Sequence, residues 1–267
     1  MEIELEKVGI DRDSKIISIS TLNPVVVKSD EKISSVSELL AKTGHRSVPV
    51  VDKKMQLFGI VTITDILSFY LSGGNLDVEV WNIMSRDVIS CSENESVDFV
   101  LKKMKISKRG RLPVVSENNK IVGIISETDF ILSSRNVGVF DDVKIKDVMS
   151  KKPFFVQSSF TIKEVMRTMV NGKYRRLPVI DGGKLSGYIT STLLFKQLVE
   201  NSFSNEFVIK RVSEIMTKNP ITVAGEENLS TVLEIMKREK ISSMLIVGEE
   251  RVIEGIFTER DYINILC

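Results

Sequence analysis

Apolar and polar positions follow nearly the same order in four successive stretches of the chain. One landmark position recurs at intervals of 64, 65 and 67 residues, at Pro24, Val88, Pro153 and Pro220. Apolar residues follow each landmark after nine, twelve and sixteen positions, and a glycine comes later in each stretch, at Gly59, Gly123, Gly187 and Gly255. The unit is longer than the usual solenoid repeat of roughly 20–50 residues. We therefore predict four small domains, at residues 13–72, 78–135, 143–201 and 209–267.

The last repeat shows the predicted elements most clearly. Residues 221–223 are short, β-branched and bounded by turn formers, which is typical of a strand. Leu229, Val232, Leu233 and Met236 recur at helical spacing, which predicts an amphipathic helix over 228–239. Two strands, 242–247 and 252–257, should flank the polar turn 248–251, and helical spacing resumes over 258–266. The expected order is strand–helix–strand–strand–helix.

The other repeats keep this order, with turns at 52–56, 117–120 and 181–184. A three-stranded sheet with one helical face cannot bury both of its sides, so we expect the units to pair through their apolar stripes. The predicted connectors are 72–75, 136–142 and 202–206. The middle connector should divide the chain into an N-terminal and a C-terminal pair.

The composition is that of an ordinary globular chain, with 42% apolar and 27% charged residues. Thirty-seven basic residues balance 36 acidic ones, which gives no overall attraction to nucleic acid or to an anionic membrane. No apolar run approaches the roughly 18 residues needed to span a bilayer, and the charged first residues do not form a secretory signal. Two distant cysteines, Cys91 and Cys267, favour a reducing cytoplasm over a disulfide scaffold. A low glutamine content is typical of a thermophile or archaeal source.

Catalytic motifs are missing. His45 is the single histidine, and with the two cysteines it offers no metal-ligand spacing. The sequence contains no nucleophile elbow, no glycine-rich phosphate loop and no Walker lysine. We therefore expect no enzyme, no metal and no cofactor.

Three sets of phrases recur at fixed offsets and carry a resemblance. They are Ile83–Ser85, Val148–Pro153 and Ile215–Pro220; then Arg111–Val115 and Arg176–Ile180; then Gly59–Asp65, Gly123–Asp129 and Gly255–Asp261. Together they resemble the cystathionine β-synthase (CBS) domain family, in four tandem copies. Two tandem pairs in one chain are similar in layout to the gamma subunit of AMP-activated protein kinase.

The resemblance implies an α/β (α+β) fold of four βαββα CBS subdomains, paired into two Bateman modules that form a disc. It also implies a regulatory protein that binds AMP, ADP or ATP in clefts between paired domains and reports occupancy to an unknown protein partner. A monomer could complete the disc, and a homodimer is a further option. The lack of a long apolar run predicts no membrane partner, and the balanced charge argues against nucleic acid.

An aspartate follows the Gly-apolar-apolar-Ser/Thr phrase by three positions in three repeats, at Asp65, Asp129 and Asp261. The hydroxyl residues of these phrases are Thr62, Ser126 and Thr258. By resemblance, these six residues bind the ribose. A bland alternative stays open, because Ser, Thr and Asp are also the usual helix caps. The third repeat has Leu193 at this position, so at most three such ribose sites are expected.

Basic residues precede the second strand of three repeats. The resemblance assigns phosphate binding to Arg46, Arg109, Arg111, Arg175 and Arg176, beside His45. The planar guanidinium suits a phosphate, although any one of these arginines could equally lie in a solvated turn. The fourth repeat has Ser242 and Ser243 instead. Arginines in three of the four repeats favour a phosphorylated ligand over S-adenosylmethionine, whose sulfonium is cationic.

The adenine should lie against the segment that opens each repeat. By resemblance, the adenine-proximal residues are Thr21, Pro24, Val26, Ser85, Val88, Ser150, Pro153, Phe155, Ile60, Ile124 and Ile256. Asp129 should work with Thr21 and Val26, and Asp261 with Ser150 and Phe155. Core packing is the plain alternative for the apolar members. Two other functions also stay open: an interaction scaffold without a ligand, and a CBS protein that binds S-adenosylmethionine or nucleic acid.

Overall fold

The computed structural model describes all 267 residues and contains four repeats with the expected strand–helix–strand–strand–helix order. The first repeat contains η1 (Ile16–Ile19), β1 (Thr21–Leu22), β2 (Val27–Lys28), α1 (Ile33–Thr43), β3 (Ser47–Val51), β4 (Leu57–Thr62) and α2 (Ile63–Leu71). The second contains η2 (Val80–Asn82), β5 (Cys91–Ser92), α3 (Val97–Ser107), β6 (Arg111–Val115), β7 (Ile121–Ser126) and α4 (Glu127–Ser133), and η3 (Gly138–Phe140) follows it.

The third repeat contains α5 (Ile145–Val148), β8 (Ser150–Lys151), β9 (Val156–Gln157), α6 (Ile162–Gly172), β10 (Arg176–Asp181), β11 (Lys184–Thr190) and α7 (Ser191–Glu200), followed by α8 (Asn205–Val208). The fourth contains η4 (Val212–Glu214), β12 (Thr217–Lys218), β13 (Thr222–Val223), α9 (Leu229–Arg238), β14 (Ser243–Val247), η5 (Glu249–Arg251), β15 (Ile253–Thr258) and α10 (Glu259–Ile265). The helix expected over 228–239 is thus α9, with Asn228 and Glu239 as its caps.

Three of the four sheets have four strands, so the expectation of three-stranded sheets was wrong. The sheet orders are β1-β7-β6-β5, β12-β11-β10-β9, β13-β14-β15-β8 and β2-β3-β4. The extra strand in each case is the two-residue run β1, β8 or β12, which pairs antiparallel with the last strand of another repeat. Such a run satisfies backbone groups at a sheet edge that would otherwise lack partners. In the fourth sheet, a bridge between Ile60 and Ser85 takes this place.

The chain folds into two compact units, and it changes unit directly after each landmark position. Unit 1 comprises Met1–Pro24, Ile89–Pro153 and Ile221–Cys267, and unit 2 comprises Val25–Val88 and Phe154–Pro220. The sequence predicted that the apolar stripes would be buried within an N-terminal and a C-terminal pair, divided at 136–142. This prediction was wrong, because each compact unit combines segments from both halves of the chain. Each unit has its own hydrophobic core.

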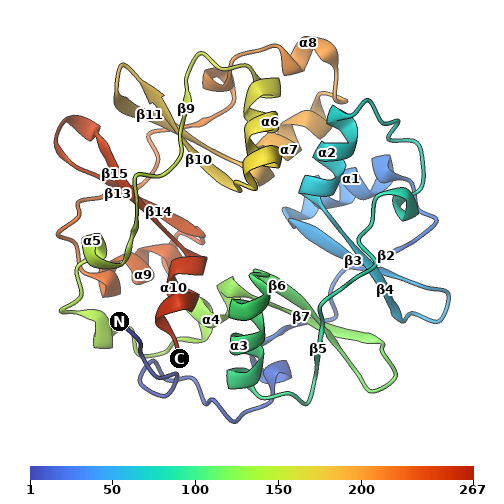
Figure 1. Ribbon diagram of the computed structural model, residues 1–267, viewed down its shortest axis with the longest axis horizontal. Helices are drawn as coiled ribbons and strands as arrows, with labels where there is room; N and C mark the ends of the chain where they lie inside the picture. The colour runs from blue at the N-terminus through green and yellow to red at the C-terminus, as the bar shows by residue number, and fades with distance from the viewer. The chain divides into compact units, whose positions relative to one another are not determined.

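In unit 1, α4 packs against α10, and in unit 2, α1 packs against α7 and α2 against α6 (Figure 1). Stripes of the second and fourth repeats thus cover each other, as do those of the first and third. Val100 and Leu233 are fully buried in the same core of unit 1, and Val36 and Val165 in that of unit 2. Helical spacing shows that a stripe is buried but carries no information on which helix covers it.

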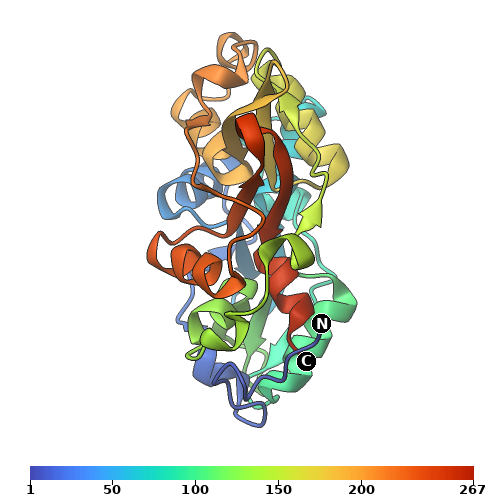
Figure 2. The ribbon, with the colours of Figure 1, turned by 90° about the vertical axis from the view of Figure 1, so that its left-hand side faces the viewer.

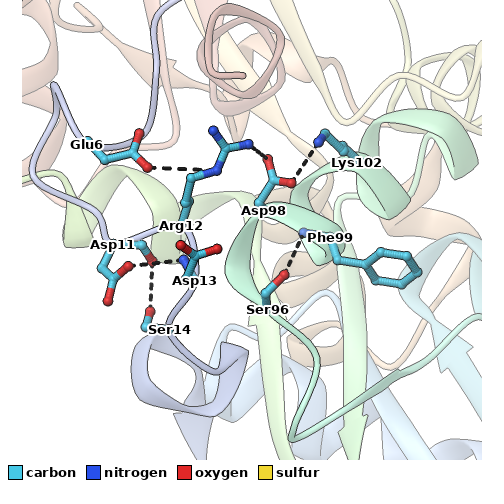
Figure 3. A network of polar contacts seen from close by, with 9 residues as sticks. All are labelled: Glu6, Asp11, Arg12, Asp13, Ser14, Ser96, Asp98, Phe99 and Lys102. Carbon is cyan, nitrogen blue, oxygen red and sulfur yellow. Dashed lines mark hydrogen bonds and ion pairs between the residues drawn. The ribbon is translucent and has the colours of Figure 1, made fainter.

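The N-terminal segment belongs to unit 1 and pairs with the C-terminal end of the chain. Ile3 and Leu266 form a parallel bridge, so the termini lie side by side (Figure 1 and Figure 2). Arg12 lies between Glu6 and Asp98 (Figure 3). Its Nε is 3.8 Å from Oε1 of Glu6, and its Nη2 is 3.1 Å from Oδ1 of Asp98. Asp98 also accepts from Lys102 at 2.7 Å. The segment is therefore anchored on the first turn of α3 by charge as well as by apolar contact.

None of the helices has both the length and the apolar character required to traverse a lipid bilayer.

Candidate ligand-binding site

Asp65, Asp129 and Asp261 each lie in the first turn of a helix and cap it. In unit 1, Oδ2 of Asp129 accepts from the backbone N of Ser126 at 2.7 Å and from its Oγ at 2.6 Å. Oδ2 of Asp261 accepts from the N and Oγ1 of Thr258 at 2.8 Å and 2.7 Å. These are capping boxes, in which a carboxylate and a hydroxyl satisfy helix N–H groups reciprocally. The capping interpretation is thus confirmed.

The second carboxylate oxygen in unit 1 faces a hydroxyl from a strand of another repeat. Thr21 of β1 donates through Oγ1 to Oδ1 of Asp129 at 3.4 Å, and Ser150 of β8 donates through Oγ to Oδ1 of Asp261 at 2.8 Å. Both carboxylates are only half-buried. The contact from Thr21 is long for an O–H donor, whose usual distance is about 2.7–2.8 Å. One oxygen therefore caps the helix, and the other accepts from a hydroxyl on a strand of another repeat.

Asp65 repeats the capping box in unit 2. Its Oδ2 accepts from the N and Oγ1 of Thr62 at 2.8 Å and 2.7 Å, and its own N–H donates back to Thr62 Oγ1 at 3.2 Å. Ser85 exchanges two backbone hydrogen bonds of 2.9 Å with Ile60 on the neighbouring strand. Here too the strand-end hydroxyl, the aspartate and an opposed serine come from a single compact unit.

The third repeat has the cap without the carboxylate. Thr190 accepts from the N–H of Leu193 at 3.1 Å, so α7 starts normally. Leucine offers no acceptor to a ribose hydroxyl, and the limit of at most three ribose sites stays a prediction.

Strand register shows which of the basic residues lie beside a helix-capping hydroxyl. Arg111 lies directly opposite Ser126, and Arg176 directly opposite Thr190. The same position is held by Ser47 and Ser243 in the first and fourth repeats. Arg109 is exposed in the turn before β6, whereas Arg46, Arg111, Arg175 and Arg176 are half-buried. Of the five arginines, only Arg111 and Arg176 share the register position beside a cap.

The adenine-proximal residues are placed in part. Thr21, Ser85 and Ser150 lie directly opposite Ile124, Ile60 and Ile256 in their ladders. Pro24 and Pro153 end segments of unit 1, and Val88 ends a segment of unit 2. Val26 and Phe155 belong to unit 2, so their pairing with Asp129 and Asp261 stays a prediction.

Unit 1 also contains a buried polar contact between α4 and α10 that the sequence pattern did not predict. Glu127 and Glu259 are each 1% exposed. Arg260 binds Glu127 and also donates to the Lys108 carbonyl at 3.1 Å, while Thr128 donates to Glu259. Glu127 lies two residues before the capping Asp129, and Arg260 lies directly before the capping Asp261. The available signal was a charged residue directly after the capping Ser/Thr, where the first and third repeats have Ile63 and Ser191.

No group of three or more His, Cys, Asp or Glu side chains is placed to hold a metal ion.

Burial makes Asp129 electrostatically unusual. Desolvation raises the pKa of its carboxyl, against the lowering effects of the Ser126 hydrogen bonds, the Arg111 charge and Thr21. A raised pKa means that the folded state keeps this proton at a pH where the unfolded chain has lost it. The contribution to stability is therefore fully present below the ordinary pKa of about 3.9 and is lost as the pH rises through the folded pKa.

We accordingly expect Asp129→Asn, which keeps an acceptor for Ser126 and removes the charge, to melt at a higher temperature than the wild type at pH 7. The difference should shrink as the pH falls towards the ordinary aspartate pKa, because the wild-type carboxyl then becomes neutral as well. Melting curves of both proteins across this range measure the effect. A difference that does not change with pH would contradict it.

Comparison with known proteins agrees with the four-repeat architecture. Residues 16–72, 80–135, 145–200 and 212–267 match the family described as the CBS domain. An uncharacterized protein of Methanocaldococcus jannaschii is 30% identical over 249 residues, which cover 82% of this chain and 87% of that protein. An uncharacterized 33.4 kDa protein of Thermofilum pendens is 26% identical over 268 residues, which cover 90% of this chain and 86% of that protein.

Two solved structures extend over nearly the whole chain. The crystal structure of the Methanocaldococcus jannaschii protein MJ1225, described as a candidate archaeal homolog of g-AMPK, has a TM-score of 0.85 at 27% identity and covers 94% of this chain and 99% of that one. An uncharacterized conserved protein from Pyrococcus horikoshii has a TM-score of 0.63 at 23% identity with the same coverage, a likeness of fold alone. The expectation of four tandem CBS domains, in a layout similar to that of the kinase gamma subunit, is thus confirmed.

Proposed function

Because this chain belongs to the CBS domain family, we propose that it is a regulatory protein that senses adenine nucleotides, AMP, ADP or ATP, at one or more of its three aspartate sites. The observation that carries the proposal is that the two carboxylate oxygens of Asp129, and likewise those of Asp261, make different contacts. One oxygen caps a helix, and the other meets a hydroxyl of a separate strand.

A ribose fits this arrangement chemically. Its vicinal hydroxyls are donors, and a half-buried carboxylate with one oxygen bound only to Thr21 or Ser150 can accept them. The displaced Thr21 or Ser150 hydroxyl would then be able to bond the ligand itself. Because these hydroxyls lie on β1 and β8, ligand binding would act on the short strands that join one repeat to another.

The regulation follows from charge. AMP, ADP and ATP place different numbers of negative charges near the arginines that precede the second strands. Each nucleotide would stabilise a different conformation by its differential affinity, and a protein partner that binds one conformation would respond to the nucleotide ratio. The proposal assigns no catalytic step to the chain, in keeping with the lack of a nucleophile-and-base arrangement in the sequence.

A calorimetric titration of the purified chain tests the proposal. AMP, ADP, ATP, adenosine and S-adenosylmethionine form the panel, and GMP is the matched control for the base. At least one adenine compound should bind with a Kd in the micromolar range, about −8 kcal/mol, which suits cellular nucleotide levels. GMP should bind more weakly.

Three outcomes would overturn the proposal. If no adenosine compound binds or raises the melting temperature, the chain is better described as an interaction scaffold. If S-adenosylmethionine alone binds, the nucleotide assignment is wrong while the adenosine site stands. Salt-dependent retention of RNA or DNA on a filter, with no nucleotide binding, would favour a nucleic-acid regulator.

A further inference from the structure

The sites of unit 1 differ in charge at one position fixed by strand register. Residues directly opposite each other in an antiparallel pair project on the same face with Cβ atoms about 4.5–5.5 Å apart. The residue opposite the helix-capping hydroxyl is Arg111 at the Asp129 site and Ser243 at the Asp261 site. The two sites are otherwise built alike, from a capping Ser or Thr, an aspartate and a hydroxyl on a short strand.

Across the chain, the arginine and the aspartate coincide only once. The first repeat combines Asp65 with Ser47, and the third combines Leu193 with Arg176. The second repeat alone has both a carboxylate for a diol and a guanidinium at the register position. The charge of Arg111 also acts on the Asp129 carboxyl, since it is one of the influences that lower the pKa of that group.

The nearby arginine of the fourth repeat does not compensate. Arg260 directly precedes Asp261, yet its guanidinium binds the buried Glu127 and the Lys108 carbonyl. Ser243 itself is 8% exposed and carries no charge. A phosphate attached to a ribose at Asp261 would approach a carboxylate with no cation supplied from the register position of that sheet.

We propose that Arg111 determines specificity and that the two sites of unit 1 take different ligand classes. The Asp129 site binds a 5′-phosphorylated nucleoside, because Arg111 offsets the repulsion between phosphate and carboxylate and can donate two hydrogen bonds to the phosphate. The Asp261 site binds a nucleoside whose 5′ substituent is uncharged. This inference rests on the proposed function, and it adds which ligand occupies which site.

The test isolates each site and uses AMP and adenosine as probes. Asp65→Ala/Asp261→Ala leaves the Asp129 site, and Asp65→Ala/Asp129→Ala leaves the Asp261 site. Calorimetry of the first variant should show AMP binding at least about tenfold tighter than adenosine. The second variant should bind adenosine at least as tightly as AMP.

Arg111→Ser in the first background should weaken AMP binding about tenfold or more and change adenosine binding by less than about threefold. Arg111→Lys should retain part of the preference for AMP. The matched control is Arg238→Ser, which makes the same change of charge at an arginine of α9 whose side chain is 69% exposed. It should leave the binding of both probes unchanged.

The outcomes separate this inference from the proposed function. An equal loss of AMP and adenosine in Arg111→Ser, or tighter binding of AMP than of adenosine at the Asp261 site, overturns the inference and leaves nucleotide sensing intact. Absence of heat with both probes in the wild type overturns both. If a double variant fails to fold, the Arg111→Ser change in the wild-type chain decides: one of the AMP sites should be lost, and every adenosine site should remain.

Discussion

Replacing Arg260 by alanine should lower the free energy of unfolding by about 3–5 kcal/mol, the largest effect of any single charge removal expected in this chain. The guanidinium binds Glu127, whose carboxylate is 1% exposed, and it donates to the Lys108 carbonyl at 3.1 Å. Without Arg260, the α4–α10 contact would contain a buried carboxylate that has lost its cation. Urea unfolding of the wild type and the variant measures the difference.

A surface arginine provides the control for this prediction. Arg238 pairs with Glu239 at 2.8 Å, but the two side chains are 69% and 40% exposed. Arg238→Ala should cost about 0–1 kcal/mol, because exposed ion pairs contribute little. If Arg260→Ala were no more costly than Arg238→Ala, the buried ion pair would have no role in holding α4 against α10.

Replacing Asp129 or Asp261 by alanine should weaken nucleotide or nucleoside binding at that site about 10- to 150-fold. If the ribose assignment holds, the change removes charged hydrogen bonds worth about 1.5–3 kcal/mol between the ligand and the carboxylate. Thr21 or Ser150 would lose its carboxylate partner at the same time. Calorimetry with AMP and adenosine, fitted for each site, measures the loss.

Two variants control for effects other than ligand contact. Asp98→Ala removes another first-turn carboxylate of unit 1, one that binds Arg12 and Lys102 (Figure 3). Leu193→Ala alters the corresponding position of the repeat that lacks the acid. Both should bind ligand as the wild type does. Unchanged affinity in all three single variants, Asp65→Ala, Asp129→Ala and Asp261→Ala, would refute the ribose assignment.

The candidate sites could be predicted from sequence as far as local chemistry reaches. The Ser/Thr-x-x-Asp spacing places a carboxylate within the first turn of a helix, and the capping boxes of Asp65, Asp129 and Asp261 confirm it. The position of Arg111 beside the capping Ser126, from which its charge acts on the Asp129 carboxyl, depends on which residues lie opposite each other in β6 and β7. Grouping the arginines by sequence neighbourhood therefore placed Arg109 and Arg111 together, although they occupy different environments.

The sequence by itself determined the repeat, the order of elements within it, the apolar stripe of each helix and the absence of an acid at Leu193. These properties depend on residues within one turn or one strand, whose geometry the spacing of side chains dictates. Tertiary structure decided that α4 meets α10 and α1 meets α7, and that β1, β8 and β12 extend the sheets of other repeats. Four similar stripes and four similar sheet edges can be matched in several ways, because hydrophobic burial is non-directional. The family resemblance predicted that Thr21 meets Asp129 and that Ser150 meets Asp261, and the structure shows both contacts. Only the packed chain selects the pairing that brings Arg260 to Glu127.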